Sequence, residues 1–380
     1  MDPKVLDYDY IPETIKYRET QIKAIRQNIL PAYQGTCPIN MILQGQPGTG
    51  KTATVKHIFK KIRETTSHII PVFINCRVIQ SEFRVFHAIF QTVLHQEAPL
   101  NGISTHRLVE TLGKKCSQTG DVILICLDDA NAIVHSHILE KVLCRLLWLH
   151  EEYPGVKIGI IATLNTTDVS ITNHLSKPVN SVFRSHHICF PPYGKWEMRV
   201  IMNDRIRAGI CPGVISPAIL DTIVKEIGED SDLRMGIGIL KCCVCLAKSD
   251  NRTSVTLTDI QASIPTVREL HLNIAASILK EEEQKVLETI ETLIRQHGEQ
   301  MNARVLHREI KKIEKIKKIE EKEQIGYSKF SRFLIRYRDL GLITISRPPH
   351  TWGNTRDILT RRTTDPNKKM DEHEITKKIP

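Results

Sequence analysis

The chain has 380 residues, of which 41% are hydrophobic and 25% charged, and its net charge is +10. This length is typical of two or three domains, and the composition excludes a disordered or fibrous protein. No apolar stretch approaches the roughly 20 residues that span a bilayer, and the N-terminus lacks the basic start and apolar block of a signal peptide, so we expect a cytoplasmic protein with no membrane partner.

The ten cysteines mostly occupy apolar stretches and lack the paired spacing of a zinc site. The run Cys242-Cys243-Val244-Cys245 lies in a helical pattern, which favours core packing over metal binding. This cysteine usage is typical of a reducing compartment.

From Gln21 to about Tyr193, short apolar segments alternate with helical stretches, a pattern that predicts a parallel α/β sheet. The segments are apolar on both faces, as strands covered by helices should be. Pro191-Pro192 ends the pattern, because proline cannot continue a ladder of backbone hydrogen bonds. The predicted strands are Asn40–Leu43, Ile69–Asn75, Val122–Leu127, Lys157–Thr163 and His187–Phe190.

The first predicted strand leads into Gly45-Gln46-Pro47-Gly48-Thr49-Gly50-Lys51-Thr52, which fits the phosphate-loop pattern G-x-x-x-x-G-K-[ST]. A helical pattern, Ala53–Ile62, follows directly, as this loop requires. The glycines let backbone N–H groups point at phosphates, while Lys51 reaches the β- and γ-phosphates and Thr52 binds Mg²⁺. The sequence therefore predicts binding of ATP or GTP with Mg²⁺.

Two carboxylates, Asp128 and Asp129, follow the predicted strand Val122–Leu127. In a phosphate-loop fold such a pair holds the metal and orients the attacking water, which assigns Asp128 to Mg²⁺ and Asp129 to the water. Caps or turn formers at the strand end are the alternative. Asp129 is one methylene shorter than the more usual Glu, and a misplacement of about 1 Å can cost about 100-fold in rate, so we expect slow hydrolysis.

Two further residues are candidates for phosphate contacts. Asn165 follows the strand Lys157–Thr163 and is placed to hydrogen-bond the γ-phosphate or its water. Arg234 lies near the start of a helix after Asp232, where a cation opposes the helix dipole, which favours an anionic partner. A turn residue and an ordinary surface arginine are the alternatives.

The pattern is helical from Gly194 to about Ser263, with breaks at Cys211-Pro212-Gly213 and Gly228. A third block, Pro265 to Arg362, predicts three helices and a hairpin, and the tail from Thr363 is expected to be disordered. The expected elements are Ala275–Gln296, Ala303–Glu323, Ser328–Leu340 and a hairpin formed by Leu342–Arg347 with Arg356–Thr360.

The positive charge is concentrated near the C-terminus. Residues 304–362 hold 16 Lys and Arg against 7 Asp and Glu, so the rest of the chain is close to neutral. A basic region attached to a nucleotide-binding module favours an anionic polymer, usually nucleic acid, as its partner. A merely solvated surface is the alternative.

Within this block, one helix pattern has an apolar side and a cationic side. The apolar residues recur every three or four positions and predict a buried stripe: Phe330, Phe333, Leu334, Tyr337 and Leu340. Lys329, Arg332 and Arg336 share the opposite side, and Gly341 is placed to end the helix. Such a helix followed by a hairpin is typical of a winged-helix DNA-binding domain, with Arg347 and Arg356 of the wing near phosphates or in a minor groove.

Together these features resemble the AAA+ ATPases, and more narrowly the archaeal origin-recognition (Orc/Cdc-type) replication initiators, over about residues 8–362. The pieces that carry the resemblance, besides the phosphate loop, are Tyr10-Ile11-Pro12, Tyr17-Arg18-Glu19-Thr20-Gln21, Asn75-Cys76-Arg77, Pro99-Leu100-Asn101-Gly102-Ile103-Ser104, Phe190-Pro191-Pro192-Tyr193 and Asp232-Leu233-Arg234.

The resemblance implies an AAA+ ATP-binding base over residues 1–193, a helical lid over 194–264, a winged-helix DNA-binding domain over 265–362 and a tail over 363–380. It makes Asn165 the first sensor and Arg234 the second, and puts Tyr17, Arg18 and Tyr193 at the nucleotide. It also implies ATP or ADP with Mg²⁺ as cofactors, a nucleoid-associated location, and partners that include duplex DNA at origins, paralogous initiators and the replicative helicase.

The chain departs from the family pattern in three places: Asp128-Asp129 replaces Asp-Glu, Pro178-Val179-Asn180-Ser181 replaces an arginine-finger segment, and His350–Arg356 replaces a Gly/Arg-rich wing tip. Lys177 or Arg184 are the candidate substitutes for the finger, which is worth about 10³ to 10⁵ in rate where it operates. These departures predict a diverged paralogue that uses ATP as a conformational ligand for DNA binding. The alternatives are an energy-using AAA+ machine and a signalling-type ATPase or regulator whose basic domain docks a protein or non-origin DNA.

Overall fold

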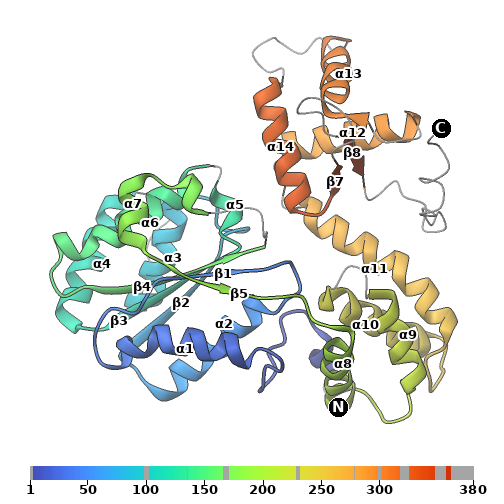
Figure 1. Ribbon diagram of the computed structural model, residues 1–380, viewed down its shortest axis with the longest axis horizontal. Helices are drawn as coiled ribbons and strands as arrows, with labels where there is room; N and C mark the ends of the chain where they lie inside the picture. Colours follow the sequence, from blue (N-terminus) through green and yellow to red (C-terminus); the bar gives the residue numbers. More distant parts are fainter. Residues whose placement is uncertain are drawn as a thin grey trace, which may run out of the picture. The chain divides into compact units, whose positions relative to one another are not determined.

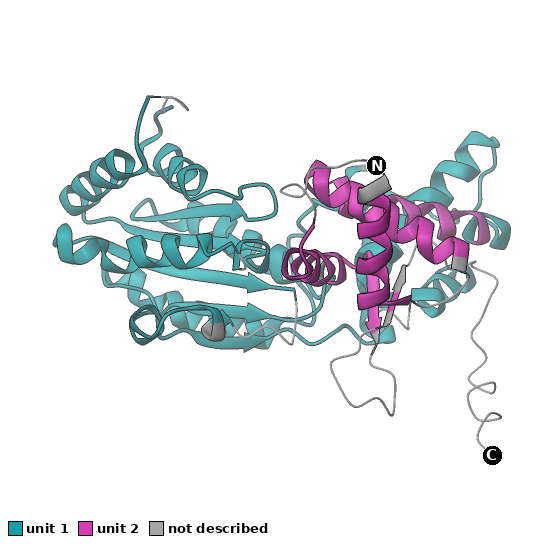
Figure 2. Cartoon of the chain, turned by 90° about the horizontal axis from the view of Figure 1, so that it is seen from above, with its two compact units in different colours: residues 1–260 teal, residues 261–380 magenta. Residues whose placement is uncertain are grey.

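The chain consists of two units, residues 1–260 (unit 1) and residues 261–380 (unit 2), shown in different colours in Figure 2. The structure is a computed structural model that describes residues 3–97, 102–134, 136–165, 171–227, 232–277, 279–297, 301–316, 325–346 and 357–360. Within these ranges no helix is both long and apolar enough to span a membrane.

Unit 1 contains a five-stranded parallel sheet with strand order β2-β3-β4-β1-β5 (Figure 1). Each strand begins and ends within one residue of a predicted strand, so the prediction of a parallel α/β sheet is confirmed. The strands are β1 (Met41–Gln44), β2 (Ile69–Asn75), β3 (Val122–Asp128), β4 (Lys157–Leu164) and β5 (His186–Cys189).

Helices cover both faces of the sheet, and each face has its own apolar core. Helices α1 and α2 pack on one face and α3, α4 and α6 on the other (Figure 1). Alternate residues of β3 point into the two cores, which is why this strand is apolar throughout. The helices of this part are α1 (Glu19–Tyr33), α2 (Lys51–Thr65), α3 (Glu82–Leu94), α4 (Thr105–Thr119), α5 (Asn131–Val134), α6 (Ile138–Glu152) and α7 (Lys177–Phe183), with short 3-10 turns at η1 (Pro3–Leu6) and η2 (Ile171–His174).

After the sheet the chain is helical: α8 (Lys195–Gly209), α9 (Pro217–Ile227), α10 (Leu233–Ser249) and α11 (Leu257–Ser277). The predicted break at Cys211-Pro212-Gly213 separates α8 from α9, with Gly213 at a φ of +88°, whereas Gly228 lies outside the described residues. The N-terminal segment is attached to these helices, because Arg205 of α8 donates hydrogen bonds to the carbonyl oxygens of Val5 and Tyr10 at 2.6 and 3.2 Å.

Unit 2 combines helices with a three-stranded antiparallel sheet of strand order β6-β8-β7. The predicted hairpin is present as β7 and β8, while the short β6 was not predicted. The elements in chain order are α12 (Glu281–His297), β6 (Met301–Asn302), α13 (Ala303–Ile316), α14 (Tyr327–Asp339), β7 (Ile343–Ser346) and β8 (Asp357–Thr360). The end of the helix predicted to reach Glu323, and the predicted tail from Thr363, lie outside the described residues.

The apolar stripe predicted for α14 forms part of the core of unit 2. Phe330, Phe333, Leu334 and Tyr337 are buried and Leu340 is partly buried. Gly341, at a φ of +72°, follows the helix as predicted, since glycine adopts this left-handed conformation without strain.

One predicted helix is wrong at its beginning. Instead of a single helix over Ala275–Gln296, α11 ends at Ser277 and α12 begins at Glu281. The Glu283 carboxylate accepts a hydrogen bond from the backbone N–H of Lys280 at 2.8 Å, and three glutamates fill the first turn of α12, where the helix dipole favours negative charge. These signals of a new helix start outweigh the continuous helical pattern.

Candidate nucleotide-binding and DNA-binding sites

The phosphate loop joins β1 to α2 and is packed closely against the segment that follows β5. Gly48 and Gly50 have φ values of +78° and +88°, which glycine tolerates without strain. A Cβ atom on Gly45 would lie 2.3 Å from the carbonyl oxygen of Phe190, and one on Gly50 would lie 2.6 Å from the hydroxyl of Tyr193. The glycines are therefore required both by the turn and by this close contact.

Lys51, at the start of α2, is buried within the loop. Its Nζ donates hydrogen bonds to the carbonyl oxygens of Gly45 and Gln46, each at 2.8 Å. Burial disfavours the charged amine and lowers the pKa of Lys51 to about 8. The amine is thus held at the loop but is bonded to backbone carbonyls, so a phosphate would have to replace those partners.

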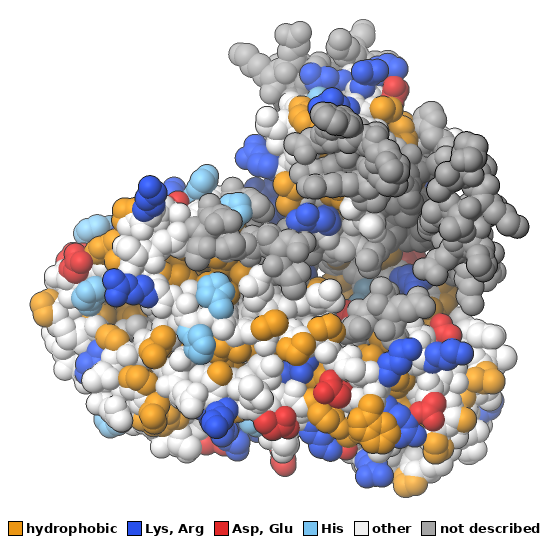
Figure 3. All heavy atoms as spheres, viewed as in Figure 1, with side chains coloured by type: hydrophobic (Ala, Val, Ile, Leu, Met, Phe, Trp, Pro, Cys, Tyr) orange, Lys and Arg blue, Asp and Glu red, His pale blue; other side chains and the backbone are white. Residues whose placement is uncertain are grey.

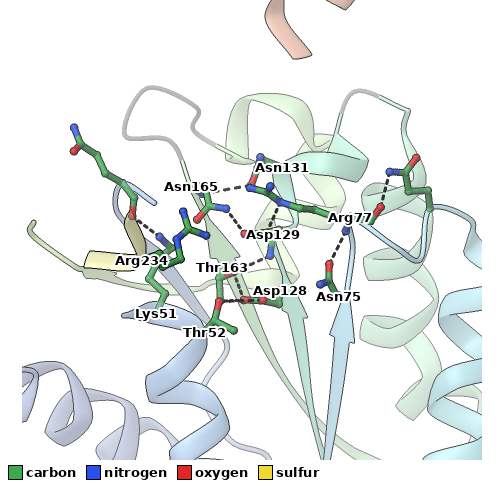
Figure 4. Close-up of polar contacts among 12 residues, drawn as sticks. Lys51, Thr52, Asn75, Arg77, Asp128, Asp129, Asn131, Thr163, Asn165 and Arg234 are labelled. Atoms are coloured by element: carbon green, nitrogen blue, oxygen red, sulfur yellow. Dashed lines mark hydrogen bonds and ion pairs between the residues drawn. The ribbon is translucent and has the colours of Figure 1, made fainter. Parts of the chain in front are cut away.

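Thr52 and Asp128 lie side by side, as predicted for a Mg²⁺ site (Figure 4). The Thr52 hydroxyl donates to both Asp128 oxygens at 2.9 and 3.0 Å, and the Thr163 hydroxyl donates to Oδ1 at 2.7 Å. Burial, and then the neighbouring charge of Asp129, raise the pKa of Asp128 to about 6. A hydroxyl and a carboxylate are oxygen ligands of the kind that Mg²⁺ prefers, and Mg²⁺ takes its remaining ligands from water and phosphate. The residues present fit this ion.

The two predicted catalytic residues, Asp129 and Asn165, are in direct contact. The Asn165 side-chain amide donates to Oδ1 of Asp129, and the backbone N–H of Asp129 donates to the Thr163 hydroxyl at 2.8 Å. Asp129 has a φ of +55°, which is uncommon for a residue other than glycine. Neighbouring strands β3 and β4 thus bring the two residues to the same edge of the sheet.

Arg77 is a third member of this cluster, and no role was predicted for it. It follows β2, and its Nε lies 2.5 Å from Oδ2 of Asp129 (Figure 4). The sequence feature that could have indicated this contact is the predicted parallel sheet. The carboxyl ends of neighbouring parallel strands meet at one edge, and β2 pairs with β3. The order of the strands, however, was not predicted.

Arg234 and Asp232 bring the start of α10 to the phosphate loop. Asp232 caps the helix, its carboxylate accepting from the backbone N–H of Arg234 at 3.0 Å and pairing with the guanidinium at 3.1 Å. A Cβ atom on Gly48 would lie 2.3 Å from Oδ1 of Asp232, so this pair lies against the loop. The carboxylate of Asp232 offsets the unfavourable position of a cation at a helix N-terminus.

Arg18 connects the N-terminal segment to the loop. Its side chain is 2% exposed and donates to the carbonyl oxygens of Thr49 at 2.9 Å and Pro191 at 2.7 Å. The guanidinium carbon also lies 3.7 Å from the centre of the Tyr193 ring. Tyr17 precedes it at a φ of +60°. Arg18 therefore fixes the loop between two other segments, and its contact with the nucleotide base stays a prediction.

Lys177 and Arg184 are the two candidate substitutes for an arginine finger. The position of Arg184 relative to the phosphate loop of the same chain follows from the sheet. It directly precedes β5, whose parallel neighbour β1 leads into the phosphate loop at its carboxyl end. Arg184 is thus at the opposite edge of the sheet, and its Nε donates to the carbonyl oxygen of Ser181 at 2.8 Å. Lys177 begins α7. Arg184 therefore does not lie at the phosphate loop of its own chain.

In α14, two of the three predicted DNA-contacting cations have acidic partners on α12. Lys329 pairs with Glu282, and Arg336 pairs with Glu283 at 3.0 Å. Arg332 is exposed and forms no ion pair with another described residue. Arg347 and Arg356 lie outside the described residues. On the face shown in Figure 3, basic and acidic side chains of the described part are interspersed with apolar ones.

Comparison with known proteins identifies the relatives of this chain. A family model described as an AAA ATPase domain matches residues 14–151. The ORC1-type DNA replication protein 2 of Methanosarcina mazei is 32% identical over 90% of this chain and 87% of its own length. The ORC1-type DNA replication protein 2 of Methanothermobacter thermautotrophicus is 30% identical over 93% of this chain and 90% of its own length.

Solved structures share the fold. The Aeropyrum pernix ORC1 protein, described in complex with DNA, is 20% identical with a TM-score of 0.75, covering 94% of this chain and 93% of that one. The Aeropyrum pernix ORC2 protein, described as ADPNP–ADP complexes, is 20% identical with a TM-score of 0.61 over the same shares. The predicted AAA+ fold is confirmed, and the chain belongs to the archaeal ORC1-type family of AAA+ DNA replication proteins.

Proposed function

We propose that this protein binds ATP and Mg²⁺ in unit 1, binds duplex DNA at replication origins through unit 2, and takes part in the initiation of replication. Nucleotide binding is supported by one observation: polar side chains from separate segments of the chain lie together at the phosphate loop. They are Lys51, Thr52, Asp128, Asp129, Asn165 and Arg234.

Each of these groups has a chemical role at a bound nucleotide. Lys51 and Arg234 supply positive charge for the phosphates, and Thr52 with Asp128 would hold Mg²⁺, which neutralises phosphate charge when it is bound. Asp129 would accept a hydrogen bond from the attacking water, and Asn165 would orient that water or the γ-phosphate. Arg18 stabilises the phosphate loop through its hydrogen bond to the carbonyl oxygen of Thr49.

We expect hydrolysis to be slow. Asp129 is shorter than Glu, and both of its carboxylate oxygens already have donors, Asn165 and Arg77. Arg184 cannot reach its own site from the opposite edge of the sheet. ATP therefore acts mainly as a ligand that sets the conformation of the protein. The proposed domains are the base at residues 1–193, the lid at 194–264 and the winged helix at 265–362.

Unit 2 supports the DNA-binding part of the proposal. The order α12, β6, α13, α14, β7, β8 is that of a winged helix, with α14 as the helix that enters the major groove and β7–β8 as the wing. Arg332 is the exposed cation of α14, while DNA phosphates would have to replace Glu282 and Glu283 as partners of Lys329 and Arg336. Paralogous initiators and the replicative helicase are the protein partners that this function implies.

Duplex binding, measured by filter retention over a range of salt concentrations, tests the proposal. Affinity should fall steeply with salt, each neutralised phosphate adding about −0.9 to the slope of log K against log salt. Charge reversal of Arg332 together with Arg336 should remove most binding. The matched control is K60E with K225E, which makes the same change in net charge at two exposed positions of unit 1.

An unchanged affinity in the R332E/R336E variant would refute the assignment of α14 as the DNA-reading helix. If the unaltered protein retains duplex DNA only weakly and regardless of the DNA sequence, the result would instead favour a signalling or regulatory ATPase whose basic domain docks a protein.

A further inference from the structure

A carboxylate lies against the phosphate loop, where the phosphates of a nucleotide are expected. A Cβ atom on Gly48 would lie 2.3 Å from Oδ1 of Asp232 and 3.0 Å from the Cα atom of the same residue. Gly48 belongs to the turn whose backbone N–H groups are expected to bind phosphate. A negative charge at this position opposes a phosphate, because the phosphate is negative as well.

The same carboxylate holds the guanidinium of Arg234. Nε of Arg234 donates to Oδ1 of Asp232 at 3.2 Å, and Nη2 donates to Oδ2 at 3.1 Å. The backbone N–H of Arg234 donates to Oδ1 as well, at 3.0 Å. Asp232 therefore both caps α10 and fixes the direction of the Arg234 side chain.

Arg234 lies close to the other cation of the loop. In Figure 4 its side chain lies beside that of Lys51. Besides burial, the charge of Arg234 lowers the pKa of Lys51, which is the effect expected of two neighbouring cations. A phosphate that reaches both cations would have to compete with Asp232 for Arg234.

The pair of Asp232 with Arg234 is of a kind that a phosphate can replace. The Arg234 side chain is 46% exposed and that of Asp232 is 21% exposed, and ion pairs in such surroundings contribute little to stability. A γ-phosphate offers a guanidinium more negative charge and more oxygen atoms than one carboxylate does. ADP lacks this group. ATP alone therefore has to break the pair, and ATP brings more negative charge against Asp232.

We propose that Asp232 is a specificity-determining residue that weakens the binding of ATP relative to ADP, by holding Arg234 and by placing negative charge at the phosphate loop. This inference rests on the proposed function, since it requires that the loop bind nucleotides. It goes further, because it assigns the balance between the two nucleotides to one carboxylate at the start of α10.

Calorimetric titration of the full-length protein with Mg²⁺ and either ADP or ADPNP, an ATP analogue that is not hydrolysed, tests this role. D232N removes the charge but keeps the cap of α10, because asparagine caps helices about as well as aspartate. D232N should bind ADPNP about tenfold more tightly than the unaltered protein does, and ADP at most about threefold more tightly. A purely structural role of Asp232 would not separate the two nucleotides.

D221N is the matched control. It makes the same change on α9 and also breaks an ion pair with an arginine, that of Asp221 with Arg199. The affinities of this variant for both nucleotides should stay within about twofold of those of the unaltered protein.

The exchange of partners at Arg234 is tested by R234Q and by the D232N/R234Q double variant. Without the guanidinium, only the repulsion between Asp232 and the phosphates remains. The substitution of Asp232 in the R234Q background should therefore raise the affinity for ADPNP by no more than about threefold. A gain as large as in the presence of Arg234 would show that Asp232 does not act by holding this residue, and would overturn the proposal.

An ADPNP affinity that is unchanged or lower in both D232N and D232S would also overturn the proposal, as would equal gains for ADPNP and ADP. D232S keeps the test decisive should D232N fail to fold, since serine caps helices and carries no charge. Titration of the unaltered protein separates the two levels. If it binds neither nucleotide, the proposed function is refuted, whereas binding without the expected gain in the variants refutes only the role of Asp232.

Discussion

The polar side chains expected at the phosphates of the nucleotide have hydrogen-bond partners within the chain. Burying such a group without a hydrogen bond would cost about 1–3 kcal/mol, so the buried Lys51 and Asp128 are satisfied internally, whereas the Arg234 side chain, which pairs with Asp232, is 46% exposed. In the proposed function, nucleotide binding would thus exchange these partners for phosphates, and we expect the affinity for ATP to reflect the difference in free energy between the old and the new bonds. The pairs are Lys51 with the loop carbonyls, Thr52 with Asp128, Asn165 with Asp129, and Arg234 with Asp232.

We expect the charge of Lys51 to make ATP binding dependent on pH. With its pKa lowered by burial to about 8, the amine loses its charge in the nucleotide-free protein as pH rises above 8. Phosphate binds the charged form, so binding takes up a proton and affinity should fall by up to about tenfold per pH unit above 8. Calorimetric titrations at pH 7, 8 and 9 measure this.

The K51A variant serves as the control for that titration, since it should bind ATP weakly and equally at all three values of pH. Equal affinity of the unaltered protein at pH 7 and pH 9 would contradict the role of the Lys51 charge.

At the scale of elements, α14 is held on α12 by both apolar and polar contacts. Tyr337 lies in the core of unit 2 and its hydroxyl donates to the carbonyl oxygen of Glu283 at 2.6 Å. This contact joins the helix proposed to read DNA to the start of α12, the very turn whose glutamates pair with Lys329 and Arg336. The orientation of the cations of α14 therefore depends on α12.

Replacing Tyr337 by Phe should lower the stability of unit 2 by about 1 kcal/mol, because the buried hydrogen bond from its hydroxyl to the carbonyl oxygen of Glu283 is lost. Urea unfolding followed by a probe in unit 2 checks this value. The control is Y327F, which makes the same change at a residue that is 45% exposed and should alter stability by less than about 0.5 kcal/mol. Equal effects of the two changes would contradict a structural role for this hydrogen bond.

At the scale of the whole molecule, the two units have separate apolar cores. We expect two transitions in calorimetric melting. ATP with Mg²⁺ at 100 times its Kd should stabilise unit 1 by about 2.7 kcal/mol and raise only its transition. F330A, which empties a buried position of unit 2, should lower only the other transition, by about 3–5 kcal/mol.

One transition that moves with both the ligand and F330A would show that the units unfold together. The shared helix α11, which begins at Leu257 and ends at Ser277, is the element that could couple them.

The sequence by itself determined the five strands, the phosphate loop, the hairpin, the buried stripe of α14 and the family, because each depends on residues close together in the chain. A strand covered on both faces must be apolar at every position, and a phosphate loop must have its glycines at fixed intervals. The start of α12 was also encoded locally, in Glu281–Glu283, but a continuous helical pattern concealed it.

Only the tertiary structure decided which distant side chains meet. Arg77 reaches Asp129 because β2 lies beside β3, and Arg18 contacts Thr49 across the fold. The cations of α14 likewise have partners on α12. Helical and strand periodicity reports which face of an element is buried, but not which element covers it. Contacts between distant segments therefore follow from the order of strands and the packing of helices, which no local pattern specifies.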